Sequence, residues 1–114
     1  MKTSPHRNTS AIVDLKAIRN NIEKFKKHIH PNAEIWPAVK ADAYGHGSVT
    51  LAKTLLENGA DRLAVARLDE GLELRHQGII APIFILGYTN PVRASEAIAY
   101  GIDVCIFDYE QARL

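Results

Sequence analysis

The residues best suited to chemistry lie in one short stretch, from Val39 to Gly47. A single lysine, Lys40, follows a hydrophobic run and directly precedes a glycine-rich turn that carries Tyr44 and His46. An amine at the end of a strand can form a Schiff base with a carbonyl group once its lone pair is free. The glycines let the backbone approach a ligand closely, and the N-terminus of the following helix can hold a phosphate.

These features together predict a site for an aldehyde that also carries a phosphate, and pyridoxal 5'-phosphate (PLP) combines both groups. The alternative is that Lys40 is a solvated lysine at the rim of a strand, because most lysines are exposed. The context favours a ligand-binding loop, since residues 35–39 are apolar and residues 41–47 are rich in small side chains. On the residue types alone, both interpretations of Lys40 stay open.

The stretch from Ala38 to Gly47 resembles the PLP-attachment signature of the alanine racemase family, in which Lys, Tyr and Gly-His-Gly occur at fixed offsets. That signature commonly has Asn or Asp at the position of Asp42. Three further segments are similar to the family's N-terminal opening, the segment after its second barrel strand, and its third strand. They are residues 11–21, 65–75 and 82–87.

The resemblance implies an α/β fold, namely the N-terminal part of a PLP-binding (β/α)8 (TIM-type) barrel with about four strand–helix units. Such a barrel alone needs about 250 residues, whereas the sequence has 114. We therefore expect an incomplete barrel over residues 11–114, preceded by a disordered tail over residues 1–10, with the family's C-terminal β domain absent. We expect the isolated chain to be inactive, as the N-terminal part of a longer enzyme.

For the full-length enzyme, the resemblance implies PLP-dependent interconversion of L-alanine and D-alanine, which supplies D-alanine for peptidoglycan. Lys40 would be the Schiff-base lysine and the base for the D-enantiomer, while the cofactor delocalises the charge left by the α-proton. The opposite face would be served by a tyrosine from the partner subunit, so we expect a homodimer. No N-terminal apolar stretch resembles a signal peptide, so we expect a cytoplasmic enzyme. Three alternatives stay open: a racemase of serine or another amino acid, a non-catalytic PLP-binding protein of the same barrel type, and an inactive fragment.

The resemblance also assigns cofactor contacts beside Lys40. Tyr44 would donate its hydroxyl to the cofactor phosphate, although a packed aromatic with a solvated tip is the alternative. Leu86, at the end of a predicted strand, is a candidate contact to the cofactor ring, although apolar residues at strand ends more often belong to the core. For His46 we prefer a hydrogen bond that shapes the loop to a role in proton transfer. Arg67 is more simply explained as a rim charge or ion-pair partner.

Composition limits the classes of partner. The formal net charge is +1, with 46% hydrophobic and 24% charged residues, which gives no basic footprint for nucleic acid or anionic lipid. We predict a small-molecule amino-acid substrate, no nucleic-acid or membrane partner, and no metal site, because no Cys/His/Asp group has ligand spacing. The lysines between residues 24 and 27 are expected on a solvated helix face, and the single Cys105 in the core.

The elements that position these residues alternate between strands and helices. Predicted strands cover residues 34–39, 62–66, 83–86 and 103–107, and the resemblance implies a further short strand at the apolar residues 11–13. Predicted helices follow the N-caps Asp14, Asn90 and Asp108 and occupy 48–58 and 69–78. Strand starts near residues 35, 62, 83 and 103 lie 27, 21 and 20 residues apart, which predicts a parallel sheet with helical crossovers. The spacing does not distinguish a barrel from a doubly wound sheet.

Overall fold

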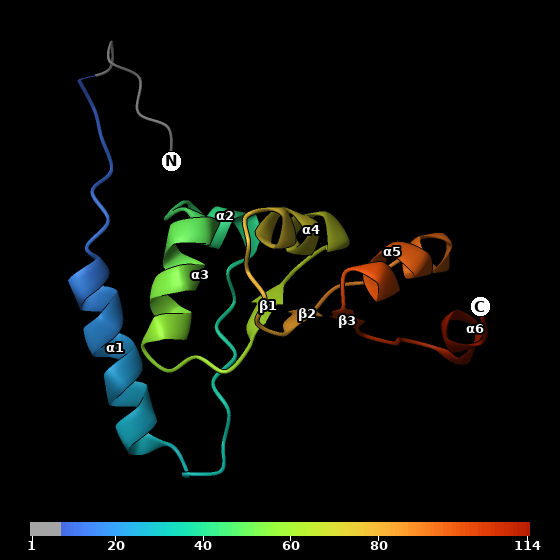
Figure 1. Ribbon diagram of the computed structural model, residues 1–114, viewed down its shortest axis with the longest axis horizontal. Helices are drawn as coiled ribbons and strands as arrows, with labels where there is room; N and C mark the ends of the chain where they lie inside the picture. Colours follow the sequence, from blue (N-terminus) through green and yellow to red (C-terminus); the bar gives the residue numbers. More distant parts are fainter. Residues whose placement is uncertain (1–7) are drawn as a thin grey trace.

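The computed structural model describes residues 8–114 (Figure 1). The helices are α1 (Leu15–His28), α2 (Lys40–Tyr44), α3 (Ser48–Glu57), α4 (Leu68–His76), α5 (Ala94–Ala99) and α6 (Tyr109–Arg113), with a 3-10 turn η1 (Pro91–Arg93) before α5. The strands are β1 (Leu63–Val65), β2 (Ile83–Ile85) and β3 (Ile102–Val104). Of the tail predicted over 1–10, residues 1–7 lie outside the described part, and residues 8–10 are exposed without a helix or strand.

The three strands form a parallel sheet in the order β1-β2-β3, which confirms the predicted α/β class. Before β1, the segment that leads to Lys40 lies on the free side of that strand through a parallel bridge from Ala38 to Ala64. Four chain segments therefore run side by side in the order of the sequence. Because all four run in the same direction, their carboxyl ends meet at one edge of the sheet.

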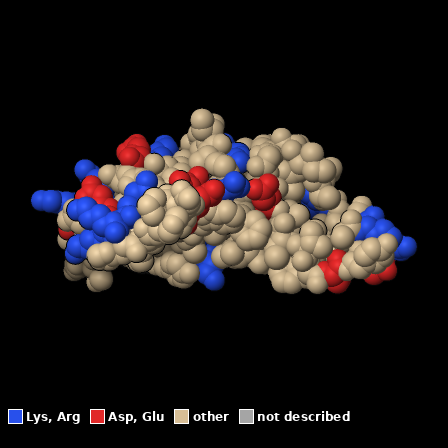
Figure 2. Space-filling model, turned by 90° about the horizontal axis from the view of Figure 1, so that it is seen from below, with Lys and Arg blue, Asp and Glu red and all other residues tan. Residues whose placement is uncertain are grey.

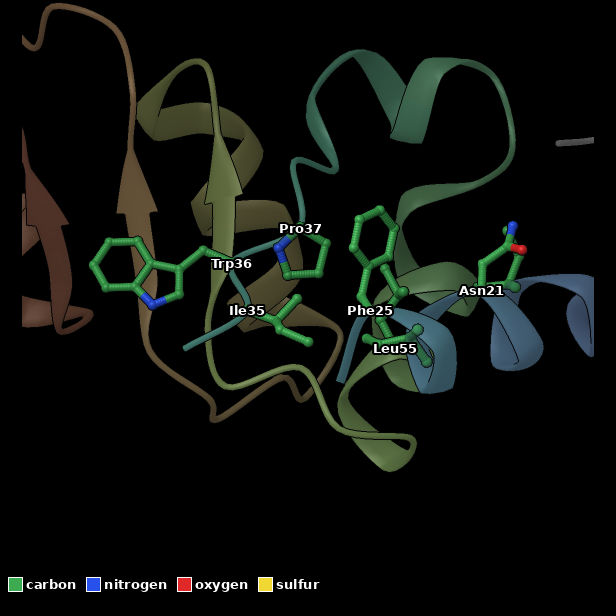
Figure 3. Close-up of a pocket in the computed structure, with 8 residues that line it drawn as sticks. Asn21, Phe25, Ile35, Trp36, Pro37 and Leu55 are labelled. Atoms are coloured by element: carbon green, nitrogen blue, oxygen red, sulfur yellow. The ribbon is translucent and has the colours of Figure 1, made fainter. Parts of the chain in front are cut away.

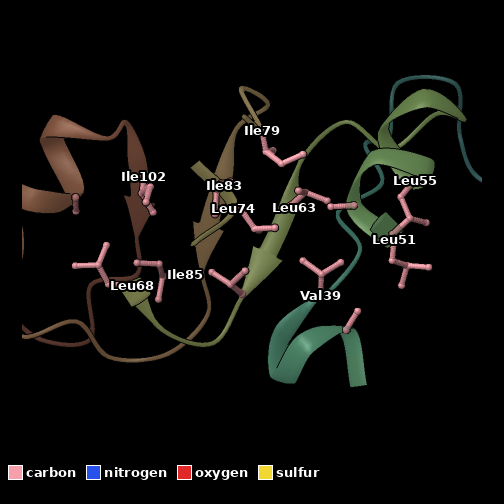
Figure 4. Packing of buried hydrophobic residues seen from close by; sticks show 14 of the residues in the cluster. Val39, Leu51, Leu55, Leu63, Leu68, Leu74, Ile79, Ile83, Ile85 and Ile102 are labelled. Carbon is pink, nitrogen blue, oxygen red and sulfur yellow. The ribbon is translucent and has the colours of Figure 1, made fainter. Parts of the chain in front are cut away.

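The hydrophobic core lies between the sheet and its helices. In Figure 1, α4 and α5 lie above the row of strands, and α4 contacts β1 and β2 while α5 contacts β3. The strand residues Leu63, Val65, Ile83 and Ile85 have no exposed surface and belong to the same core as residues of α3, α4 and α5 (Figure 4). Each fully buried side chain of this size contributes about 1.5–3 kcal/mol. This burial fixes the position of the sheet edge that carries Lys40.

The alternate residues of the strands form the opposite face of the sheet, which no helix of residues 8–114 covers. Trp36 lies edge-on against Phe84, with ring centroids 5.7 Å apart. The Arg62 guanidinium stacks over Trp36 at 4.9 Å and forms an ion pair with Asp103 at 3.4 Å. A second ion pair joins Arg62 to Glu34 at 3.0 Å. This face is therefore polar and aromatic, in contrast to the aliphatic core.

Three expected strands are wrong in extent, and one of them, predicted over 103–107, ends at Val104. Residues 11–13 form no strand, because Ile12 is 92% exposed and no described segment pairs with this part of the chain. The predicted strand over 34–39 is reduced to the bridge at Ala38. It has β1 as its one described neighbour, and Pro37 has no N–H to donate to a ladder.

The predicted helix caps are confirmed in position. Asp14, Asn90 and Asp108 each accept hydrogen bonds from backbone N–H groups at the start of α1, η1 and α6. The side chain of Gln111, three residues after Asp108, accepts from the backbone N–H of Phe107, the residue before this cap, at 2.7 Å. Local side-chain chemistry therefore sets where these elements begin.

The amino ends of the strands are held by Arg75, which the sequence did not single out. Its guanidinium donates to the backbone carbonyls of Ile79, Ala81, Tyr100 and Gly101 at 2.7–3.0 Å. Partial burial lowers the pKa of Arg75 from its ordinary value, but a guanidinium stays charged at neutral pH. One side chain thereby joins the turn after α4 to the end of α5.

The charged side chains form no large surface of one sign on the face shown in Figure 2. Basic residues gather over the end of the molecule formed by α1, whose last turn contains Lys26, Lys27 and His28, and acidic residues lie among them. These basic residues are exposed, as predicted for a solvated helix face. Within the described residues, none of the helices has both the length and the hydrophobicity that crossing a bilayer requires.

Candidate functional site

Lys40 lies at the carboxyl end of its parallel segment. The backbone N–H of Val39 donates to the carbonyl of Ala64 at 2.9 Å, and the N–H of Ala64 donates to the carbonyl of Pro37 at 2.9 Å. These bonds fix the backbone directly before Lys40 against β1. The Lys40 side chain is half-buried, at the edge of the sheet where parallel α/β folds bind their ligands.

The segment α2 is not a right-handed helix, because its residues after Lys40 form a left-handed turn. The sequence did not predict this conformation. Ala41, Asp42, Ala43 and Tyr44 all have positive φ angles, between 50° and 56°. For L-residues this conformation costs about 1–2 kcal/mol each, because Cβ crowds the following carbonyl oxygen. Four such residues in a row are uncommon outside glycine-rich sequence, so the surrounding contacts must stabilise the turn.

Hydrogen bonds within the turn and to the residues directly before and after it supply part of that stabilisation. The Asp42 carboxylate accepts from the backbone N–H of Ser48, the first residue of α3, at 2.8 Å. The Ala43 N–H donates to the carbonyl of Val39 at 3.0 Å, and Ala43 is 1% exposed. The Nδ1 atom of His46 lies 3.0 Å from the carbonyl of Ala43, which is consistent with the loop-shaping role that we preferred for this histidine.

Glu70, the third residue of α4, connects this turn to the neighbouring strand. One oxygen of its carboxylate accepts from the backbone N–H of Ala41 at 2.6 Å. The other accepts from the N–H groups of Ala66 and Arg67 at 2.9 and 3.0 Å. Glu70 was not among the residues predicted from the sequence. The available signal was an acidic residue at the third position of a helix, which predicts a bond back to the helix start but not one to another strand end.

Lys40 and Leu86 lie at matching positions along the sheet edge. Ala38 is aligned with Ala64, and Ala64 with Phe84. Lys40 and Leu86 each come two residues after a member of this row. Leu86 is 43% exposed, so this side chain is available to a ligand at the edge and is not packed in the core.

Tyr44 and Lys40 keep their polar groups available for a ligand. Tyr44 ends the left-handed turn and is 62% exposed, and its hydroxyl has no hydrogen-bond partner among the described residues. Within the same part of the chain, the Lys40 amine forms no ion pair or hydrogen bond. An amine that could join an aldehyde, a phenol that could donate to a phosphate and an apolar side chain that could contact a ring lie at one sheet edge, so these residues fit part of what PLP would require.

A charged group lies at the same sheet edge between α4 and α5. Arg93 pairs with Asp69 at 2.8 Å and with Glu96 at 2.8 Å. The hydrogen bonds to Arg93 lower the pKa values of Asp69 and Glu96, and the two carboxylates raise the pKa of Arg93. Arg67 is exposed and forms no ion pair with a described residue, in agreement with the rim-charge explanation.

An apolar hollow of about 260 Å³ lies elsewhere, between α1, α3 and residues 35–37 (Figure 3). Its lining includes Phe25 and Leu55 but not Lys40, so it does not belong to the candidate site.

Cys105 is half-buried, which corrects the expectation of a core thiol. Among residues 8–114, no three His, Cys, Asp or Glu side chains are grouped so that they could hold a metal ion.

Known proteins resemble this chain over the region that contains the sheet and the candidate site. Residues 13–114 match the family described as "Alanine racemase, N-terminal domain". The chain is 58% identical over 114 residues to the alanine racemase of Lactococcus lactis subsp. lactis (strain IL1403). This match covers all of the present chain but only 31% of that protein. It therefore covers about a third of the length of the curated relatives that it matches most strongly.

Two solved structures have the same backbone arrangement. The alanine racemase from Bacillus anthracis with bound L-Ala-P has a TM-score of 0.86 at 46% identity, and the match covers 89% of this chain and 26% of that one. The histidine racemase from Leuconostoc mesenteroides subsp. sake has a TM-score of 0.88 at 34% identity, and the match covers 96% of this chain and 29% of that one.

Proposed function

Because the chain belongs to the alanine racemase family, through that family's N-terminal domain, we propose that it is part of a PLP-dependent amino-acid racemase. The observation that carries this proposal is the position of Lys40, at the carboxyl end of a parallel segment and at the start of a left-handed turn. The substrate that we propose is alanine, with conversion between the L- and D-enantiomers.

We propose that residues 11–114 form the first part of a (β/α)8 barrel. Four parallel segments follow one another in sequence order, with no reversal of strand order in the described part. The helices α4 and α5 lie on one side of the sheet, as on the outside of a barrel, whereas a doubly wound sheet has helices on both sides (Figure 1). The uncovered face with Trp36 and Arg62 would then point into the barrel.

Three residues would hold the cofactor. Lys40 would attach it covalently through Nζ, the hydroxyl of Tyr44 would donate to its phosphate, and Leu86 would contact its ring. The bound cofactor supplies an electron sink that stabilises the charge left when the α-proton of an amino acid is removed. Lys40 would take and return this proton at Nζ on the face that serves the D-enantiomer, and its half-buried position limits the access of water.

Racemisation needs a second acid or base on the opposite face of the substrate. We propose that a tyrosine from a partner subunit supplies it, which requires a homodimer, and that the enzyme is cytoplasmic. The same tyrosine would belong to a C-terminal β domain beyond residues 11–114. The 114-residue chain alone would accordingly not racemise alanine.

A second substrate deserves a test. The likeness to a histidine racemase, with a TM-score of 0.88, supports a racemase of a larger amino acid as the alternative to alanine. Both proposals share the role of Lys40 and differ in the size of the side chain that the site accepts.

The experiment is reduction of the natively produced protein with borohydride, followed by intact-mass measurement and peptide mapping. We expect a reduced pyridoxyl group on Lys40. In a separate sample that has not been reduced, we expect D-alanine to form from L-alanine faster than D-histidine or D-serine forms from its L-enantiomer. Absence of the adduct would contradict the cofactor proposal. An adduct with faster turnover of histidine or serine would contradict the substrate proposal only.

A further inference from the structure

Among the described residues, the turn after Lys40 has one hydrogen bond to an element that is not its neighbour in the sequence. The remaining backbone and side-chain hydrogen bonds of residues 40–47 join positions inside the stretch, or join it to Val39 before it and to Ser48 and Leu51 in the first turn of α3. The exception is the N–H of Ala41, which donates to Glu70 in α4 at 2.6 Å. This N–H belongs to the peptide unit that also contains the carbonyl of Lys40.

The internal bonds shape the turn but do not orient it relative to β1. A left-handed turn of alanine, aspartate and tyrosine is strained at each residue, so a rearrangement that relieves the φ angles is favourable locally. Glu70 opposes that rearrangement with a charge-assisted bond, which is shorter and stronger than a bond between neutral groups. Its second oxygen is fixed at the end of β1 by the N–H groups of Ala66 and Arg67.

We propose that Glu70 is the positioning residue for Lys40. By joining the Lys40–Ala41 peptide to the end of β1, it sets the direction in which the lysine amine leaves the backbone. This inference rests on the proposed function for its chemical consequence, because it makes Glu70 responsible for correct placement of the amine that attaches the cofactor. The structural part, that Glu70 orders residues 40–47, does not depend on the cofactor.

A carboxylate is required because both of its oxygens accept hydrogen bonds. In Glu70→Gln one oxygen is replaced by an NH₂ group, which cannot accept from a backbone N–H. The remaining oxygen satisfies two donors if it faces Ala66 and Arg67, so the amide group is left opposite Ala41. The variant thus keeps the start of α4 and removes the bond to the turn.

Glu73→Gln is the matched control. Glu73 lies one turn later on the same helix, is exposed, and forms no side-chain hydrogen bond or ion pair with a described residue. The first measurement is backbone hydrogen exchange of the natively produced protein after removal of cofactor. We expect exchange in residues 40–47 to be about 10- to 100-fold faster in Glu70→Gln than in Glu73→Gln, with β2 unchanged in both.

The second measurement is chemical. The rate at which added pyridoxal 5'-phosphate becomes fixed to Lys40 by borohydride should fall about tenfold or more in Glu70→Gln. In the loaded protein, kcat should fall by a similar factor with little change in KM, because the amine and not the amino-acid pocket is misplaced. The visible absorbance of the bound cofactor should also shift in its pH dependence, which a loss of stability alone would not cause.

Equal exchange and equal labelling in Glu70→Gln and Glu73→Gln would overturn the proposal. If the wild-type protein shows no adduct on Lys40, the proposed function fails while the exchange experiment still decides whether Glu70 orders the turn. If Glu70→Gln does not fold, Glu70→Asp is measured by the same exchange experiment. Its shorter side chain keeps the charge but cannot reach both strand ends, so slow exchange in residues 40–47 of that variant would overturn the proposal.

Discussion

The carboxylate of Asp42 accepts a hydrogen bond from the backbone N–H of Ser48 at 2.8 Å. The residue that lies two positions after Lys40 therefore caps the helix that begins six residues later. Gly47, which directly precedes α3, has no side chain that could do this. The cap links the position of the lysine to the position of α3, because a single side chain belongs to the turn and serves the helix.

Asp42→Ala should lower the free energy of unfolding by about 1 kcal/mol, because the first turn of α3 loses its acceptor. Asp42→Asn should leave it nearly unchanged, since the amide oxygen can accept the same bond. Chemical denaturation of the natively produced protein measures both. Equal destabilisation by the two substitutions would show that the charge of Asp42 matters rather than the cap.

Lys40→Ala should abolish racemisation, with a loss of turnover of about a thousandfold or more, and should remove the visible absorbance of the bound cofactor. The reason is that the amine is required both to hold the cofactor and to move the proton. Lys53→Ala, at an exposed position of α3, is the control and should retain wild-type turnover. Normal racemisation by Lys40→Ala would exclude this lysine as the attachment residue.

Gly87→Ala should destabilise the protein by about 1–3 kcal/mol. The backbone N–H of Gly87 donates to the carbonyl of Ala66 at 3.2 Å, and a Cβ on Gly87 would lie 2.5 Å from that oxygen. The contrasting substitution is Gly71→Ala in α4, whose Cβ would meet the end of the flexible Ile102 side chain at 3.1 Å.

Gly71→Ala should change the unfolding free energy by less than about 1 kcal/mol, because the gain in helix propensity offsets the small shift of Ile102. Thermal unfolding of the two variants, measured side by side, checks the pair. A larger loss in Gly71→Ala than in Gly87→Ala would contradict the close backbone approach at the carboxyl ends of β1 and β2.

The ion pairs of Arg93 should make stability depend on pH in the acidic range. Hydrogen bonds to Arg93 lower the pKa values of Asp69 and Glu96. The contribution of these ion pairs to the free energy of unfolding is therefore fully present above the ordinary carboxyl pKa of about 4. This contribution is lost as the pH falls through the lowered pKa values that Asp69 and Glu96 have in the folded protein. The melting temperature should therefore fall more steeply below about pH 4 in the wild type than in Arg93→Gln.

Arg113→Gln provides the control for this experiment. Arg113 pairs with Glu110 at 3.1 Å in an exposed pair of α6, and exposed pairs of this kind contribute little. Its pH dependence should match that of the wild type. The interpretation fails if Arg93→Gln and Arg113→Gln give the same slope between about pH 2 and pH 5.

The parts of the fold that depend on neighbouring residues could be predicted from the sequence. The caps at Asp14, Asn90 and Asp108 are local, because each side chain bonds to the backbone two or three residues away. The strand at 34–39 was overestimated, because its apolar residues indicate burial while the number of paired neighbours is set by the whole sheet. The order in which the strands lie in the sheet depends on the paths of the helical crossovers, and the number of residues between strands does not reveal those paths.

The sequence proposes residues for the candidate site but does not predict the geometry of the turn that carries them. The position of Lys40 at a strand end follows from the hydrophobic run before it. The left-handed conformation of Ala41 and Ala43 does not, because alanine carries no preference for a positive φ and only the contacts of the turn select it. Glu70 was missed for the same reason, since its bond to Ala41 joins residues that are 29 positions apart.

The left-handed turn also has a stereochemical consequence. The φ angles of 50° and 55° at Ala41 and Ala43 are unfavourable for L-alanine but lie in the mirror image of the right-handed helical region. A D-alanine introduced at either position by chemical ligation would therefore adopt the native backbone as its preferred conformation. In this segment, inversion of a single Cα centre would relieve conformational strain while leaving the hydrogen bonds of the backbone in place.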